Sequence, residues 1–84
     1  MEKREKERSE KSLLKLEQRL QDAEKLGFKL KYSKIFSLAS QYAKDSRHYF
    51  EKGDFFTSFG CSDYAYGLID ALLIFEGKKG EFPE

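Results

Sequence analysis

The sequence predicts an all-α protein. It contains no Val, and its β-branched side chains are only Ile35, Thr57, Ile69 and Ile74. Strands draw on β-branched residues, whereas helices lose side-chain freedom by including them. The single proline, Pro83, lies near the C-terminus, where it interrupts no helical pattern. Apolar residues recur at helical spacing over most of the chain. We therefore expect an antiparallel up-down-up three-helix bundle with helices at about residues 3–26, 33–52 and 54–76.

Eighty-four residues allow one domain. Residues 1–11 mix both signs of charge and have no apolar side chain after Met1, which is typical of a solvated, partly frayed helical extension. We expect the folded domain at 12–76 and a tail at 77–84. The seam of the first helix is predicted to consist of Leu13, Leu16, Leu20 and Ala23.

The connection at residues 28–33 is expected to be a loop that covers the end of the bundle, after Gly27 has ended the first helix in the left-handed conformation. Its neighbourhood is the most basic part of the chain, with Lys25, Lys29, Lys31 and Lys34. Lysines interleaved with aromatic residues can bind phosphates or single-stranded nucleic acid. We favour a solvated loop.

The second helix is expected to be amphipathic, with Ser33 as its N-cap. His48 falls on the polar side of this helix, so we expect an exposed histidine. Gly53 and Asp54 form a joint in which the glycine ends one helix and the aspartate caps the next. So short a joint predicts an antiparallel helical hairpin.

The third helix is expected to be the most buried of the three. No Lys or Arg occurs from Gly53 to Gly77, although 37% of the chain is charged. Apolar side chains point almost all the way round this helix, which is typical of a helix buried on most sides. Gly60 and Gly67 lie in its interior and predict the close approach of a neighbouring backbone or of a ligand.

The candidate site lies on the third helix and consists of Asp63, Tyr66, Gly67 and Asp70. The two carboxylates lie seven residues apart and so nearly on one line along the helix. The interpretation that we favour is structural, in which each carboxylate meets a hydroxyl, a cation or solvent. The alternatives are a shared divalent cation, an acid–base pair, or a surface for a basic partner.

Composition excludes several classes of function. One Cys and one His cannot make a four-ligand zinc site. No phosphate-binding loop and no hydrolase or metalloprotease motif occurs. We therefore expect no catalytic residue, no metal and no cofactor. The net charge of +1 makes nucleic acid an improbable partner, and the absence of a long apolar run predicts no membrane span. The charged N-terminus is unlike a signal peptide, so the expected location is the cytoplasm.

Part of the chain resembles the archaeal family catalogued as domain of unknown function 357. The resemblance covers about residues 35–75. The residues that carry it are Tyr42, Asp45, Tyr49-Phe50, Gly53-Asp54, Phe59, Tyr64-Ala65-Tyr66-Gly67 and Asp70-Ala71. The family signature reads G-D-x-x-x-A-F followed by Y-A-x-G-x-x-D-A. This chain departs from it with Ser58 in place of Ala and Tyr66 in place of His, which argues against a role that needs an imidazole there. The resemblance implies a three-helix bundle in an archaeal protein and no established activity.

The function that we expect is that of a non-catalytic protein-interaction or accessory module, with a protein partner that is either a second copy or another chain. The alternative is a small-ligand or nucleotide-binding subunit that uses the Asp63 and Asp70 side of the third helix. An interaction module should expose an apolar patch, whereas a ligand-binding subunit should have a concave pocket that bears the two carboxylates.

Overall fold

The computed structural model describes residues 2–81, and this part of the chain contains helices and no strand. The elements are α1 (Glu2–Lys25), α2 (Phe28–Lys31), α3 (Ser33–Glu51), α4 (Phe55–Phe75) and the 3-10 turn η1 (Lys79–Glu81). The all-α prediction is therefore confirmed. Residues 82–84 of the expected tail and Met1 of the expected extension lie outside the described residues.

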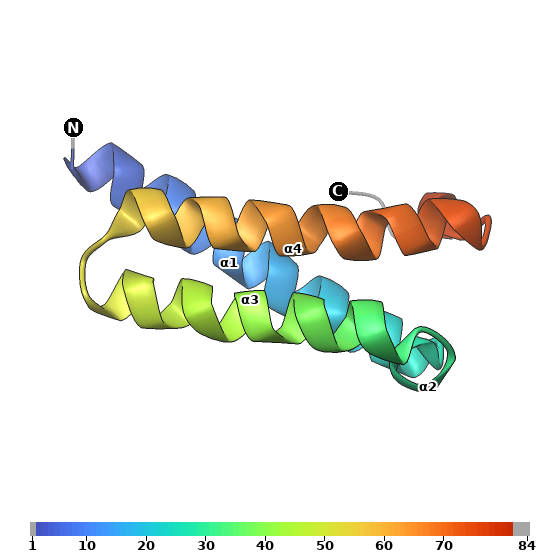
Figure 1. Ribbon diagram of the computed structural model, residues 1–84. Coiled ribbons are helices and arrows are strands. Elements are labelled where there is room, and N and C mark those ends of the chain that lie inside the picture. Colours follow the sequence, from blue (N-terminus) through green and yellow to red (C-terminus); the bar gives the residue numbers. More distant parts are fainter. Residues whose placement is uncertain (1, 82–84) are drawn as a thin grey trace.

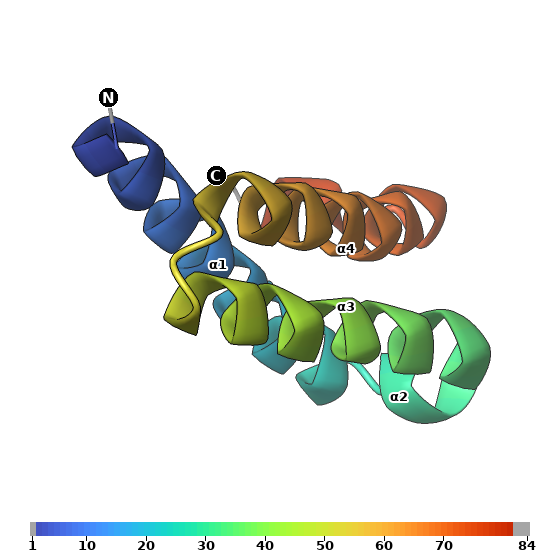
Figure 2. The same cartoon turned by 60° about the vertical axis from the view of Figure 1, so that its left-hand side comes forward.

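The two helices of the C-terminal hairpin, α3 and α4, lie side by side and antiparallel, and α1 crosses behind both of them (Figure 1). The oblique course of α1 across the pair is visible in the turned view (Figure 2). The joint between α3 and α4 is built as the sequence predicts. Gly53 is left-handed with φ 85°, and the Asp54 carboxylate accepts a hydrogen bond of 3.1 Å from the backbone N–H of Thr57.

The connection between α1 and α3 is a helical turn, so the expectation of a loop was wrong. Gly27 ends α1 with φ 83°, as expected, but the chain then forms the four-residue helix α2. Local hydrogen bonds make this turn, because the N–H groups of Lys31 and Tyr32 donate to the carbonyls of Gly27 and Phe28. Tyr32, and not Ser33, holds the N-cap position of α3, and no side chain caps that end.

The core lies where α1 meets the α3–α4 pair. Its buried members are Leu16, Ala23, Phe28, Phe36, Ala39, Ala43, Ala65, Ile69, Leu72 and Leu73. Phe28 enters this core from α2. Leu30 of the same turn is 90% exposed, so this residue does not cover the end of the bundle, contrary to the expectation for this connection.

Serines fill part of the interior toward the other end of the helices. Ser46 and Ser58 are buried and bond reciprocally, each hydroxyl donating to the other residue's backbone carbonyl at 2.7 and 2.8 Å. The hydroxyls of Ser12 and Ser62 lie 2.7 Å apart and join α1 to α4. Small polar side chains let the three long helices approach closely here while their hydroxyls remain hydrogen-bonded.

One side of α4 faces solvent, although this helix has more buried residues than α1 or α3, as expected of the most buried helix. Phe56 is 85% exposed and Ile74 is 61% exposed. The apolar residues that point all the way round α4 therefore divide between a buried side and an exposed side. Such an exposed apolar surface is a feature of interaction sites and calls for explanation.

Candidate functional site

The four residues of the predicted site do not converge on one cleft. Tyr66 and Asp70 are half-buried, on the side of α4 that receives α1, whereas Asp63 and Gly67 are exposed. These residues span about two turns of α4, but the packing of α1 covers only part of the circumference of the helix. The two carboxylates that the sequence places on one line of the helix thus lie in different environments, Asp70 half-buried and Asp63 exposed.

Tyr66 is surrounded by cations. The buried Arg19 of α1 donates a hydrogen bond of 2.8 Å from Nη2 to the Tyr66 hydroxyl. Its guanidinium lies 5.4 Å from the centroid of the Tyr66 ring, and the Lys15 ammonium lies 4.7 Å from the same centroid. Cations attract the electron-rich face of an aromatic ring, so these contacts fasten α1 to α4.

Asp70 forms an ion pair and a hydrogen bond with Lys79. Lys79 belongs to η1, beyond the end of α4, and the chain returns there to bring its ammonium within 6.0 Å of the centroid of the Tyr66 ring. Sequence reasoning missed this cation, because the stretch around Asp70 contains no Lys or Arg. Asp70 therefore links the C-terminal turn to α4 through this contact.

The two interior glycines of α4 do not receive a neighbouring backbone. A Cβ placed on Gly60 or Gly67 would meet no atom within 4 Å, so the expectation of a close approach was wrong for this single chain. Glycine in a helix interior destabilises the helix by about 1 kcal/mol relative to alanine. No contact among the described residues offsets that cost at either position.

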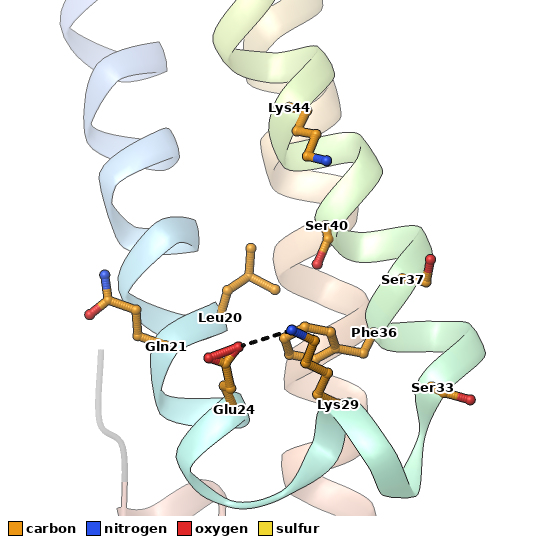
Figure 3. Close-up of a pocket in the computed structure, with 9 residues that line it drawn as sticks. All are labelled: Leu20, Gln21, Glu24, Lys29, Ser33, Phe36, Ser37, Ser40 and Lys44. Carbon is orange, nitrogen blue, oxygen red and sulfur yellow. Dashed lines mark ion pairs between the residues drawn. The ribbon is translucent and has the colours of Figure 1, made fainter.

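A hollow of about 540 Å³ lies between α1, α2 and α3 (Figure 3). It is lined by Leu20, Gln21, Glu24, Lys29, Ser33, Phe36, Ser37, Ser40 and Lys44. Figure 3 shows Lys29 reaching across its mouth toward Glu24, and the two charged groups lie 3.7 Å apart. Both side chains are more than half exposed, so this ion pair contributes little to stability. Neither Asp63 nor Asp70 lines the hollow.

A second surface, formed by α3 and α4 together, faces away from α1. The rings of Tyr42 and Tyr64 lie 4.8 Å apart, which joins the two helices on this side. Ser62 and Tyr66 contact α1, and each is two residues, or about 200° of helical rotation, from Tyr64. Tyr64 therefore points away from α1, and 51% of its surface is exposed.

Other apolar residues extend this surface at helical spacing along both helices. We call it the open face and define it by Ile35, Leu38, Tyr42 and Tyr49 of α3 with Tyr64, Leu68, Ala71 and Phe75 of α4. Leu38 is 43% exposed and Phe75 is 79% exposed. Figure 1 views the molecule from this side, and no described helix lies in front of the pair.

Charged residues lie at both ends of the open face, with Asp45, Asp54 and the exposed Lys52 at the Gly53 end. Burial raises the pKa of the Cys61 thiol, and the negative charges of Asp45 and Asp54 raise it further. Both carboxylates accept hydrogen bonds from neutral donors, Asp45 from the Gln41 amide and Asp54 from the backbone N–H of Thr57.

The opposite end of the open face is basic. Lys34 and Leu38 line the same shallow hollow, so Lys34 lies beside the open face. Lys31 lies 2.7 Å from a carboxylate oxygen of Glu76. Its hydrogen bond to Glu76 raises the pKa of Lys31, and the hydrogen bonds from Lys31 and Tyr32 lower the pKa of the Glu76 carboxyl. Lys31 thus stays protonated and is ion-paired with Glu76, and Lys34 is exposed.

The sequence contains the signal for the open face: α4 is the most buried of the long helices, as expected, but its apolar residues also occupy the side that stays exposed. The stretch from Gly53 to Gly77 is apolar on every side of a helix, and only two other long helices are available to cover it. A helix that packs against two neighbours keeps one side exposed. His48 is exposed, as expected. Among the described residues no group of three or more His, Cys, Asp or Glu could hold a metal ion, and no helix is long and apolar enough to cross a membrane.

Comparison with known proteins gives one result. No curated protein and no solved structure matches the chain. A family model described as "Protein of unknown function (DUF357)" matches residues 9–76, which include all of α2, α3 and α4 and most of α1. The match thus contains both the open face and the Tyr66 contacts with α1, and the chain belongs to the DUF357 family.

Proposed function

We propose that the chain is a non-catalytic protein-interaction module, an up-down-up bundle of three long helices that binds a protein partner through the open face. One observation carries this proposal. The open face combines exposed aromatic and aliphatic side chains, such as Leu38, Tyr64 and Phe75, and its eight defining residues carry no charge. Monomeric proteins rarely leave such a contiguous apolar surface in water, whereas interaction sites have one.

The composition of the open face agrees with this role. Interface cores are enriched in aromatic residues and depleted of charged ones. The ring of the half-buried Tyr42 contacts that of the exposed Tyr64 at a tilt of 57°, so the two side chains hold each other in place. An ordered aromatic surface loses little conformational entropy when a partner covers it.

The alternative function, a ligand-binding subunit that uses Asp63 and Asp70, lacks a comparable observation. Asp70 is engaged by Lys79, and the hollow of Figure 3 is lined by α1, α2 and α3. Catalysis likewise lacks support, because no nucleophile is seen beside a base among the described residues. The open face is the feature that the geometry favours.

Photo-crosslinking tests the proposal. A benzophenone amino acid replaces Tyr64 on the open face in one variant and Lys44 in a control variant. Lys44 also lies on an exposed helix surface, but it lines the hollow on the α1 side. We expect a crosslinked protein species from the Tyr64 variant, in the purified chain or in an extract of the source cells, and none of that species from the Lys44 variant. Identical crosslinks from both variants, or none from either, would contradict the proposal.

A further inference from the structure

We infer that the occupant of the open face is a second copy of this chain, related to the first by a two-fold axis that makes the paired helices antiparallel. This inference rests on the proposed function and adds the identity of the partner. It follows from the placement of one cation and one carboxylate on α3, from the size of the open face, and from the exposed Gly67 beside it, halfway along α4.

The charges on α3 are complementary under such an axis. Lys34 and Asp45 lie eleven residues apart, which is three helical turns plus about 20°, so both stand on the same edge of the open face. They are separated by about 16 Å along the helix. Consider a two-fold axis that runs along the open face and crosses α3 at right angles, midway between these two residues. This axis puts the Lys34 of one copy where the Asp45 of the other copy lies. It places Lys34 of each copy opposite Asp45 of the other and forms two ion pairs.

The same axis passes the middle of α4. Tyr42 and Tyr64 lie side by side on the antiparallel helices. The point midway between Lys34 and Asp45 lies two to three residues before Tyr42, so on α4 it is level with a residue two to three positions after Tyr64, which is Gly67. A Cβ added to Gly67 would have no neighbour within 4 Å, and the missing side chain permits the α4 helices of two copies to approach closely at the axis. This contact gives a physical reason for a glycine in the interior of an exposed helix.

The area suffices for a stable dimer. The 21 residues of α4 extend about 31 Å, and two helices packed side by side are about 20 Å wide. The open face therefore covers about 600 Å² in projection, and a dimer would bury about twice that area in total, which lies within the range of specific interfaces. The net charge of +1 per chain gives two copies little mutual repulsion.

Other occupants fit the same surface less well. A basic helix would complement the Asp45 end but would meet Lys34 at the other end, and an acidic helix would have the reverse conflict. The charged N-terminal residues of another copy, from Lys3 to Lys11, contain no apolar side chain for an aromatic surface. A second copy in antiparallel orientation satisfies both ends.

Sedimentation equilibrium on the purified full chain, over a wide range of concentration at low salt, tests the inference. We expect a mass that rises to twice the monomer mass. Tyr64→Lys should weaken the dimer by at least tenfold while the helical circular dichroism is retained, and Leu38→Lys serves as the second variant if the first alters the fold. Lys44→Asp, on the α1 side of α3, is the control and should leave the dimer unchanged.

Charge reversal tests the antiparallel register. Asp45→Lys and Lys34→Asp should each weaken self-association by about tenfold, because each creates two like-charged pairs. The two single variants mixed together should form a heterodimer, since every pair is then again of opposite sign. The chain with both substitutions should dimerise like the original.

The outcomes separate the two proposals. A chain that remains monomeric at every concentration overturns the inference, as does a dimer that is insensitive to Tyr64→Lys or to the charge reversals. If a monomeric chain still crosslinks another protein through position 64, the interaction function stands and only the identity of the partner is wrong. If neither the dimer nor the crosslink forms, both proposals fail.

Discussion

Ser9 provides the sharpest test of how this small bundle is stabilised. The residue is completely buried in α1, and its hydroxyl has no hydrogen-bond partner among the described residues. An unsatisfied buried hydroxyl costs about 1–3 kcal/mol. Alanine also favours a helix over serine by a few tenths of a kcal/mol. Ser9→Ala should therefore raise the free energy of unfolding by about 1 kcal/mol or more.

Thermal and urea denaturation followed by circular dichroism measures this change. For a domain of this size, 1 kcal/mol corresponds to about 4–8 °C in Tm. The matched control is Ser46→Ala, which also removes one buried hydroxyl. Ser46 donates to the Ser58 carbonyl at 2.7 Å and lies 3.0 Å from the Ser58 hydroxyl, so its removal should lower stability by about 1 kcal/mol. A loss of stability in Ser9→Ala equal to that in Ser46→Ala would refute the reasoning, because it would mean that the Ser9 hydroxyl is bonded.

Three further predictions concern the joint, the pH dependence and the candidate site. Gly53→Val should lower stability by more than about 1 kcal/mol in thermal melts, because φ is 85° and a β-branched residue is strained there even though space is open. The folded-state pKa of Glu76 is lowered, so its contribution to stability is present above roughly pH 4.3 and is lost as pH falls further. Urea titrations from pH 6 to about pH 3 should therefore show a smaller acid loss in Glu76→Gln than in the original chain, and equal losses would contradict this. Asp70→Asn should cost less than about 1 kcal/mol, since its ion pair with Lys79 is partly exposed, and Asp63→Asn should leave Tm nearly unchanged. A Tm loss in Asp63→Asn that exceeds the loss in Asp70→Asn would be incompatible with the exposed position of Asp63.

The sequence predicts correctly those features that are determined by residues close together in the chain. The lack of β-branched residues determined the all-helical class, and glycines at 27 and 53 marked positions that require a left-handed backbone. Asp54 could be recognised as a cap because its partner lies three residues away. The prediction of a loop at α2 was wrong, because the alternation of apolar and basic residues there has no helical period, whereas the turn is made by hydrogen bonds within five residues of chain.

Tertiary packing decided everything that depends on which side of a helix is covered. The apolar residues of α4 are equally compatible with full burial and with an open face, and only the oblique position of α1 shows that one side remains exposed (Figure 2). The candidate carboxylates were separated for the same reason. Lys79 reaches Asp70 only because the chain turns back after α4. A sequence determines the periodicity of a helix, but the number and placement of the neighbouring helices determine which of its sides are buried. Here they leave the aromatic open face exposed.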